Sequence, residues 1–150
     1  MNVAWGNMMG FRSFGSLVAL GLMLAAALPA SGQSRHRSTP SFSSIGASAS
    51  PASLSVGGTE TVSVSLRSTT SASNLIVQLA IRDAASTVIA YRNFSGQSFS
   101  AGQTRTFSAG FSMVGRGTGT YTVSVGVFSA DWSRNYYWAD RLATFTIVST

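Results

Sequence analysis

The sequence predicts an all-β fold in which short antiparallel strands pack as a two-layer sandwich. The first observation is that apolar and polar residues alternate with period two through most of residues 45–150, which places successive side chains on opposite faces of a strand. The second is that clusters of Gly, Asp, Ser and Pro interrupt this alternation at near-regular intervals. The third is that no part of this stretch shows the period of a helix. Together these patterns favour an all-β domain.

About seven strands account for the alternation. Residues 61–66 alternate over six residues, with Val62, Val64 and Leu66 on one face, and indicate a half-buried strand. Residues 74–82 are apolar on both faces, as expected for a central strand. The predicted strands lie near residues 45–50, 61–66, 74–82, 87–94, 103–113, 120–128 and 143–148, with a loop at 96–102 and a longer one at 129–141.

Strands of this number and spacing are typical of an antiparallel β-sandwich of the immunoglobulin or fibronectin type III kind, with a closed barrel as the alternative. Such sandwiches often place a tyrosine near the start of a late strand, where its hydroxyl bonds back to the preceding connection. Tyr121 follows Gly119 at this position. We therefore expect Tyr121 to have a packing role rather than a ligand role.

The first 44 residues have a different character. Residues 1–32 are predicted to be a signal peptide, because Arg12 precedes an apolar run at 17–28 and small residues follow it. That run is shorter than the about 20 residues of a membrane span, so no span is expected in the mature form. Residues 33–44 are predicted to be a disordered lead-in and residues 45–150 the sandwich domain. The expected location is secreted, either extracellular or periplasmic.

Composition excludes most catalytic designs. Charged residues make up 9% of the 150 residues, against about 25% in an average protein, and Cys is absent. Without Cys there is no disulfide, thiol nucleophile or thiolate metal site. His36 lies between two Arg residues in the lead-in, so serine catalysis lacks a placed base. We expect no enzyme activity, no catalytic residues, no cofactor and no metal site.

The segment 129–141 is the part of the sequence that folding explains least. It is longer than a plain hairpin connection requires and mixes aromatic rings with planar polar groups. Rings can stack on the C–H faces of a sugar while carboxylate and guanidinium groups bind its hydroxyls. Trp132 has an alternative role as a plug for the open end of the core. The predicted ligand-binding residues are Asp131, Trp132, Arg134, Tyr136, Tyr137, Trp138 and Asp140.

These residues also carry a resemblance to a known family. The chain resembles the immunoglobulin-like or fibronectin type III-like accessory modules, of carbohydrate-binding type, found in secreted bacterial glycoside hydrolases. The similarity extends over residues 54–148, and residues 119–146 carry most of it. The motifs concerned are Gly119 to Phe128, Asp131-Trp132-Ser133, Tyr136, Trp138 and Ala143-Thr144-Phe145-Thr146. The resemblance implies an all-β, noncatalytic module that holds polysaccharide for an enzyme or spaces its domains.

The charge of the protein says less about its binding partner than the aromatic segment does. The formal net charge is +6, but the Arg residues are dispersed along the chain, so nucleic acid is an unlikely partner. We predict a secreted noncatalytic binding module whose ligand is a polysaccharide or cell-surface glycan. A protein partner such as a secreted glycoside hydrolase is a further expectation. The alternative is a protein-interaction or structural subunit of an extracellular assembly, including a protease-inhibitor-like sandwich.

Overall fold

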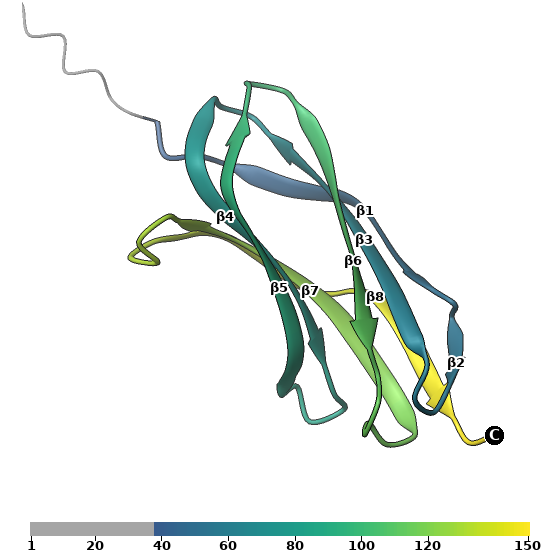
Figure 1. The fold of residues 1–150 in the computed structure, drawn as a ribbon. Helices are drawn as coiled ribbons and strands as arrows, with labels where there is room; N and C mark the ends of the chain where they lie inside the picture. The colour runs from purple at the N-terminus through teal and green to yellow at the C-terminus, as the bar shows by residue number, and fades with distance from the viewer. Residues whose placement is uncertain (1–37) are drawn as a thin grey trace, which may run out of the picture. The chain divides into compact units, whose positions relative to one another are not determined.

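The structure of the protein, a computed structural model, describes residues 38–150 (Figure 1). This part of the chain contains eight β-strands and no helix. No segment of residues 38–150 therefore meets the length and apolarity of a membrane-spanning helix. The strands are β1 (Phe42–Ser50), β2 (Ser53–Ser55), β3 (Thr59–Ser68), β4 (Ala72–Arg82), β5 (Val88–Phe99), β6 (Thr104–Ser112), β7 (Gly119–Ser129) and β8 (Asn135–Val148).

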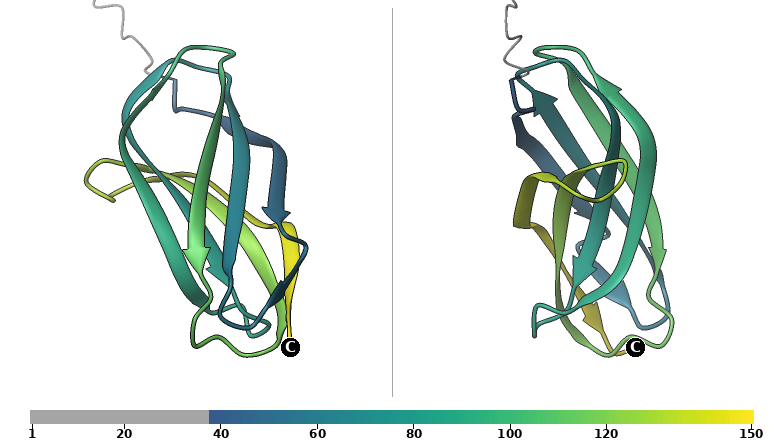
Figure 2. Two further views of the ribbon diagram at one scale, coloured as in Figure 1. Left: turned by 45° about the vertical axis from the view of Figure 1, so that its right-hand side comes forward. Right: turned by 90° about the vertical axis from the view of Figure 1, so that its left-hand side faces the viewer.

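The strands form two sheets, as the sequence predicts. One sheet has three strands in the order β1-β3-β6, and the other has five in the order β2-β8-β7-β4-β5. All pairings are antiparallel except that of β2 with β8. Figure 2 shows the two sheets as separate layers rather than a closed barrel. The all-β sandwich prediction is confirmed, with the three-residue β2 as an additional strand.

The core lies between the layers and is built by alternation. Val62, Val64 and Leu66 of β3 are fully buried on the inner face of the three-stranded sheet. Alternate residues of β4 and β7, from Leu75 to Ile81 and from Tyr121 to Val127, face them from the other sheet. Each large apolar side chain buried in this way contributes roughly 1.5 to 3 kcal/mol. The sandwich is therefore held by apolar burial.

Tyr121 has the packing role expected from the sequence. Its hydroxyl donates a hydrogen bond to the carbonyl oxygen of Gly117 at 2.8 Å. Its ring stacks on that of Phe145 in β8, with centroids 5.5 Å apart. The hydrogen bond ties the β6–β7 connection to the start of β7, as the tyrosine of many such sandwiches does.

The start of β1 and the end of β5 differ from the predicted boundaries. Strand β1 begins at Phe42, so the lead-in predicted for 33–44 ends earlier than expected, because Phe42 is buried in the core. Strand β5 continues to Phe99 through most of the predicted loop at 96–102. Gly96, with φ of 65°, accommodates a bulge there, after which the pairing with β4 resumes at Gln97. Residues 1–37 lie outside the described residues, and the signal peptide therefore remains a prediction.

The prediction of a long loop at residues 129–141 is wrong. Strand β8 begins at Asn135, and the connection closes with a hydrogen bond from the Ser129 N–H to the Arg134 carbonyl at 3.0 Å. The register of β8 against β7 shifts between Val123 and Val125, where Arg141 has a positive φ of 54°. Such a bulge interrupts the alternation of side chains, which is why the sequence indicates a loop here. Figures 1 and 2 show the β7–β8 hairpin projecting from the sandwich.

Candidate functional site

The outer face of the five-stranded sheet, which points away from the core, is the candidate site. Register places its residues side by side: Ile76 lies beside Phe128, Gln78 beside Gly126, and Gly126 in turn beside Trp138. Ile76 is only 5% exposed although it is not part of the core between the sheets. Neighbouring side chains must therefore cover it, so this face is not a simple solvated surface.

Aromatic rings lie over the centre of this face because Gly126 has no side chain. A Cβ atom at Gly126 would come within 2.5 Å of the Phe128 ring and 2.7 Å of the Trp138 ring. The Phe128 ring centroid is 6.2 Å from that of Trp138 and 4.9 Å from that of Trp132 at the hairpin. The three rings form one group, which we call the aromatic platform. Trp132, at 47% exposed, presents the largest open surface of the group.

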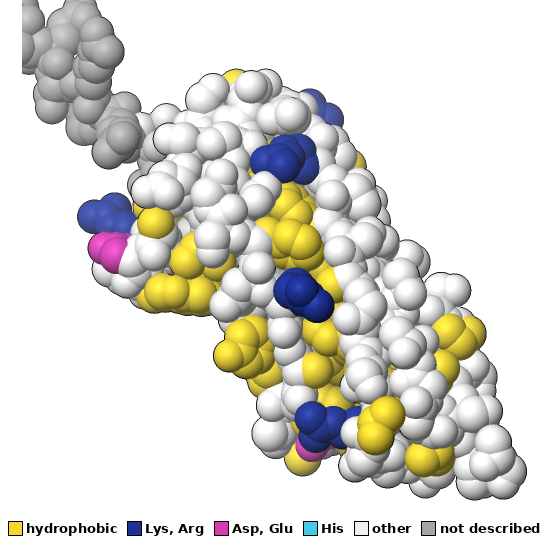
Figure 3. Space-filling model, in the orientation of Figure 1, with side chains coloured by type: hydrophobic (Ala, Val, Ile, Leu, Met, Phe, Trp, Pro, Cys, Tyr) yellow, Lys and Arg dark blue, Asp and Glu magenta, His cyan; other side chains and the backbone are white. Residues whose placement is uncertain are grey.

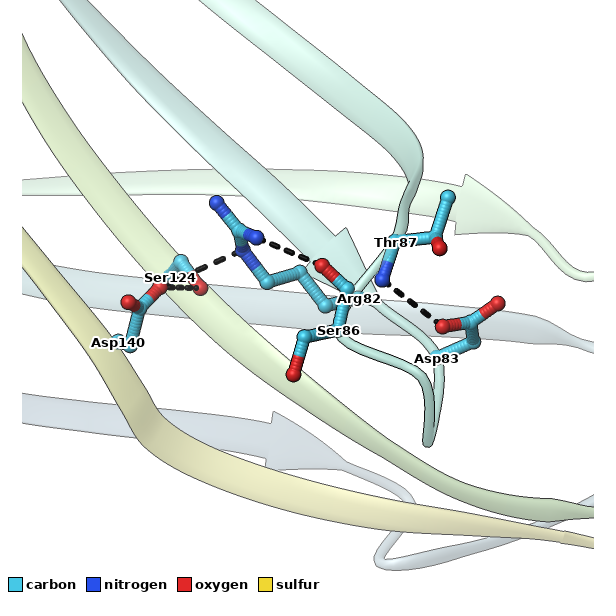
Figure 4. A network of polar contacts seen from close by, with 6 residues as sticks. All are labelled: Arg82, Asp83, Ser86, Thr87, Ser124 and Asp140. Carbon is cyan, nitrogen blue, oxygen red and sulfur yellow. Dashed lines mark hydrogen bonds and ion pairs between the residues drawn. The ribbon is translucent and has the colours of Figure 1, made fainter.

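A charged pair borders the aromatic platform. The Nε atom of Arg82 in β4 lies 3.3 Å from Oδ1 of Asp140 in β8, and the Ser124 hydroxyl donates to the same oxygen at 2.9 Å (Figure 4). The Arg82 guanidinium also lies over the Trp138 ring, 5.2 Å from its centroid. Its Nη1 donates to the carbonyl oxygen of Ser86 in the β4–β5 turn. These contacts fix the orientation of Asp140, whose side chain is half exposed and can accept further hydrogen bonds.

Asp83 stabilises that turn. Its Oδ1 accepts hydrogen bonds from the backbone N–H groups of Ala85 and Thr87, at 3.0 and 2.9 Å. Figure 4 shows Asp83 pointing away from the Arg82–Asp140 pair. Asp83 is thus a turn residue, whereas Asp140 faces the candidate site.

Strands β4 and β5 add polar and aromatic groups that sequence reasoning missed. Gln78 Nε2 donates to Asn93 Oδ1 at 3.0 Å across the two strands. Tyr91, which pairs with Ala80, is 62% exposed. The signal for Tyr91 was present in the sequence, because an aromatic ring at an outward position of a strand is otherwise unexplained. It could be placed on the same sheet face as Trp138, with β4 and β7 between them, only once the strand order was known.

The tip of the β7–β8 hairpin is held by Asp131. Its Oδ1 accepts hydrogen bonds from the hydroxyls of Ser129 and Ser133 and from the backbone N–H of Ser133, at 2.6 to 3.0 Å. These hydrogen bonds, that of Ser129 foremost, lower the pKa of Asp131 to about 2. Trp132 occupies the left-handed position of this turn, with φ of 61°. Asp131 therefore stabilises the turn of the hairpin that carries Trp132.

The remaining predicted residues lie elsewhere. Arg134, Tyr136 and Asp131 line an open cavity of about 770 Å³ at the end of the sandwich, together with Ser and Thr side chains. Tyr137 lies against β1, where its hydroxyl accepts from the Ser44 N–H at 2.9 Å and donates to the Ser44 hydroxyl. This contact joins the two sheets, so Tyr137 has a structural role.

Comparison with known proteins gives the family. The model of the Wzt C-terminal domain matches residues 44–150, which is most of the chain. The chain belongs to the Wzt C-terminal domain family. No curated protein sequence matches it. A crystal structure of the C-terminal domain of Wzt superposes with a TM-score of 0.55 and 14% sequence identity, covering 76% of this chain and 81% of that one.

Another similar structure is the CARDB domain of a Pyrococcus furiosus protein, solved in complex with di-metal ions. It covers 75% of this chain and 96% of that one, with a TM-score of 0.52 and 11% identity. A β-glucosidase from Erythrobacter marinus has a TM-score of 0.49 and 17% identity, covering 73% of this chain and 16% of that one. At 14% and 11% identity, the likenesses to the Wzt and CARDB domains show the fold alone. They lend no support to the predicted association with glycoside hydrolases.

For this member of the Wzt C-terminal domain family, the structure divides the seven predicted site residues into two groups. Trp132, Trp138 and Asp140 come together on the outer face, whereas the other four lie at the hairpin tip, the end cavity or the contact between the sheets. The role of Trp132 as a plug is wrong, because its side chain is exposed and packs on Phe128 outside the core. Within residues 38–150, no three His, Cys, Asp or Glu side chains cluster as metal ligands would.

Proposed function

We propose that this domain is a noncatalytic binding module that holds a polysaccharide on the outer face of the five-stranded sheet. The observation that carries the proposal is the aromatic platform, whose Phe128 and Trp138 rings lie over Gly126 and which is bordered by the Arg82–Asp140 pair. Flat rings offer apolar contact to the C–H groups of a pyranose, and the adjoining carboxylate, guanidinium and amide groups can bind its hydroxyls. Trp132, Trp138, Asp140, Arg82 and Tyr91 are the proposed contact residues.

Family membership supports the same function. The Wzt C-terminal domain is a noncatalytic binding domain of carbohydrate-binding type. A domain of this type needs a preformed surface rather than a reactive group, and pre-organised side chains lower the cost of binding. The hydrogen bonds that fix Asp140 and Gln78 supply such order on this sheet.

Fluorescence titration tests the proposal, because the two tryptophans of residues 38–150 both lie at the aromatic platform. We expect the emission of the purified protein to change on addition of a matching member of a panel of soluble glucan, galactan, mannan and xylan. Tyr91→Ala retains both reporters and should weaken binding about threefold to tenfold, as expected for one aromatic contact. Gly126→Ala should weaken it as well, because the added Cβ would displace the Phe128 and Trp138 rings.

Ile45→Ala is the matched control. Ile45 is also exposed, at 55%, but lies on β1 in the other sheet, so its substitution should leave the affinity unchanged. Equal weakening by Tyr91→Ala and Ile45→Ala would place the site elsewhere. A folded protein that binds no member of the panel would contradict the proposal and favour a protein-interaction role.

A further inference from the structure

A second surface lies at the seam between strands β5 and β6, the facing edges of the two sheets. Three Arg side chains are spaced along it. Nη1 of Arg105 donates to the Ser98 carbonyl at 2.7 Å, and Nη2 of Arg116 donates to the Ile89 carbonyl at 2.6 Å. Arg92 of β5 lies between these two levels of the strand and is exposed. Since a strand rises about 3.3 Å per residue, the row extends over roughly 30 Å.

Apolar side chains form the floor of this seam. The Arg105 guanidinium lies over the rings of Phe99 and Phe107, 5.5 and 5.3 Å from their centroids. A hollow of about 220 Å³ is lined by Arg92, Phe94, Ser108 and Ala109. Figure 3 shows basic side chains spaced along a strip of hydrophobic ones over β5 and β6.

No carboxylate of the chain neutralises this row. The sequence contains four acidic residues, and all of them lie within residues 38–150. Glu60 is buried in the sandwich, Asp83 holds the β4–β5 turn, Asp131 holds the hairpin and Asp140 pairs with Arg82. The Arg82–Asp140 pair is the one ion pair found in the described residues. The positive charge of the seam is therefore available to a ligand.

We propose that the β5–β6 seam is a second binding site, which takes an acidic polysaccharide through carboxylate groups carried along the glycan chain. Each guanidinium has five N–H donors in a planar fork, so Arg105 and Arg116 keep donors after bonding to the strand. Arg binds carboxylates through paired hydrogen bonds, and the ring-lined floor fits the C–H faces of sugar residues. The bonds to Ser98 and Ile89 hold two of the cations in place before the ligand arrives.

The shape of the seam favours an extended polysaccharide chain over other anionic ligands. The three cations form one narrow row with an apolar floor, which matches an extended polymer with its charges on one side. A lipid surface would instead be met by a broad basic face, and duplex nucleic acid by clustered basic residues following its two backbones. Unlike the outer face, where Arg82 and Asp140 pair, the seam has no ion pair among residues 38–150.

Binding of oligogalacturonate, an unbranched chain with one carboxylate per sugar, tests this inference by calorimetry. Arg92→Gln removes one cation of the row, and Arg92 makes no hydrogen bond to the rest of the described protein, so the fold should persist. We expect this variant to bind about tenfold more weakly, as for one charge-assisted contact. Arg67→Gln, on the outward side of β3, removes the same charge outside the seam and should change affinity less than twofold.

Further binding measurements distinguish the acidic-polysaccharide site from non-specific charge attraction and from membrane binding. The methyl-esterified oligogalacturonate should not bind measurably, whereas equal binding of ester and acid would overturn the inference. Equal weakening by Arg92→Gln and Arg67→Gln would also overturn it, because net charge rather than the row would then govern binding. Tighter Arg92-dependent binding to phosphatidylglycerol vesicles would assign the seam to a membrane instead. Tyr91→Ala on the outer face should leave oligogalacturonate binding unchanged, which separates this site from the proposed neutral-glycan site.

Discussion

At the scale of single residues, Glu60 is the least expected feature of the core. Its side chain is fully buried among Val62 and other apolar residues, and neither carboxylate oxygen has a hydrogen-bond partner within residues 38–150. Loss of hydration on burial raises the pKa of Glu60 above its ordinary value. The predicted strand began at residue 61, whereas β3 begins at Thr59, so the burial of Glu60 was not expected.

Because the Glu60 carboxyl is buried, we expect the stability of the fold to depend on pH. The pKa of Glu60 in the folded protein is raised above its ordinary value of 4.5. Below pH 4.5 the carboxyl is protonated in both the folded and the unfolded state, so its burial costs no ionisation energy. As the pH rises through the folded-state pKa, the free energy of unfolding falls. Glu60→Gln removes the charge and should raise the free energy of unfolding at pH 7 by roughly 1 kcal/mol, or the melting temperature by about 4 °C. Thermal unfolding between pH 4 and 8 measures this. Parallel pH profiles for the two proteins would refute the assignment.

At the scale of elements, alternation predicts strands well and fails where a bulge interrupts it. Strands β3, β4 and β7 appear close to their expected positions because one face of each is regularly apolar. The start of β8 could not be predicted, since Tyr136, Tyr137 and Trp138 are consecutive aromatics and the bulge near Arg141 shifts the register. The sequence indicates a loop for the aromatic segment, whereas its residues from Asn135 onward belong to strand β8.

The β7–β8 hairpin carries a prediction of its own. The hydrogen bonds from Ser129 and Ser133 lower the pKa of Asp131 from 3.8 to about 2. They therefore stabilise the hairpin fully at pH values above 3.8, and this stabilisation is lost as the pH falls towards 2. Asp131→Ala should speed amide hydrogen exchange at Ser133 by several-fold at neutral pH and leave the centre of β4 protected. Exchange measured by NMR gives the result. An unchanged rate at Ser133 would contradict the role given to Asp131.

At the scale of the whole molecule, the sandwich brings together residues that are far apart in the chain. The outer face combines Tyr91 and Arg82 with Trp138, and the seam aligns Arg residues that are dispersed in the sequence. Of these residues the sequence singles out Trp138, and it does not supply the strand order that places the others on the same surfaces. The fold class could be predicted from local patterns, whereas both proposed sites depend on long-range pairing.

The central claim is that the outer face of the five-stranded sheet holds the glycan. Two-dimensional NMR of the labelled protein, titrated with the polysaccharide that gives the fluorescence response, tests it most directly. We expect the largest shifts at the indole N–H signals of Trp132 and Trp138 and at the side-chain amides of Gln78 and Asn93. Shifts confined to the end cavity near Tyr136, or to the three-stranded sheet, would contradict the claim.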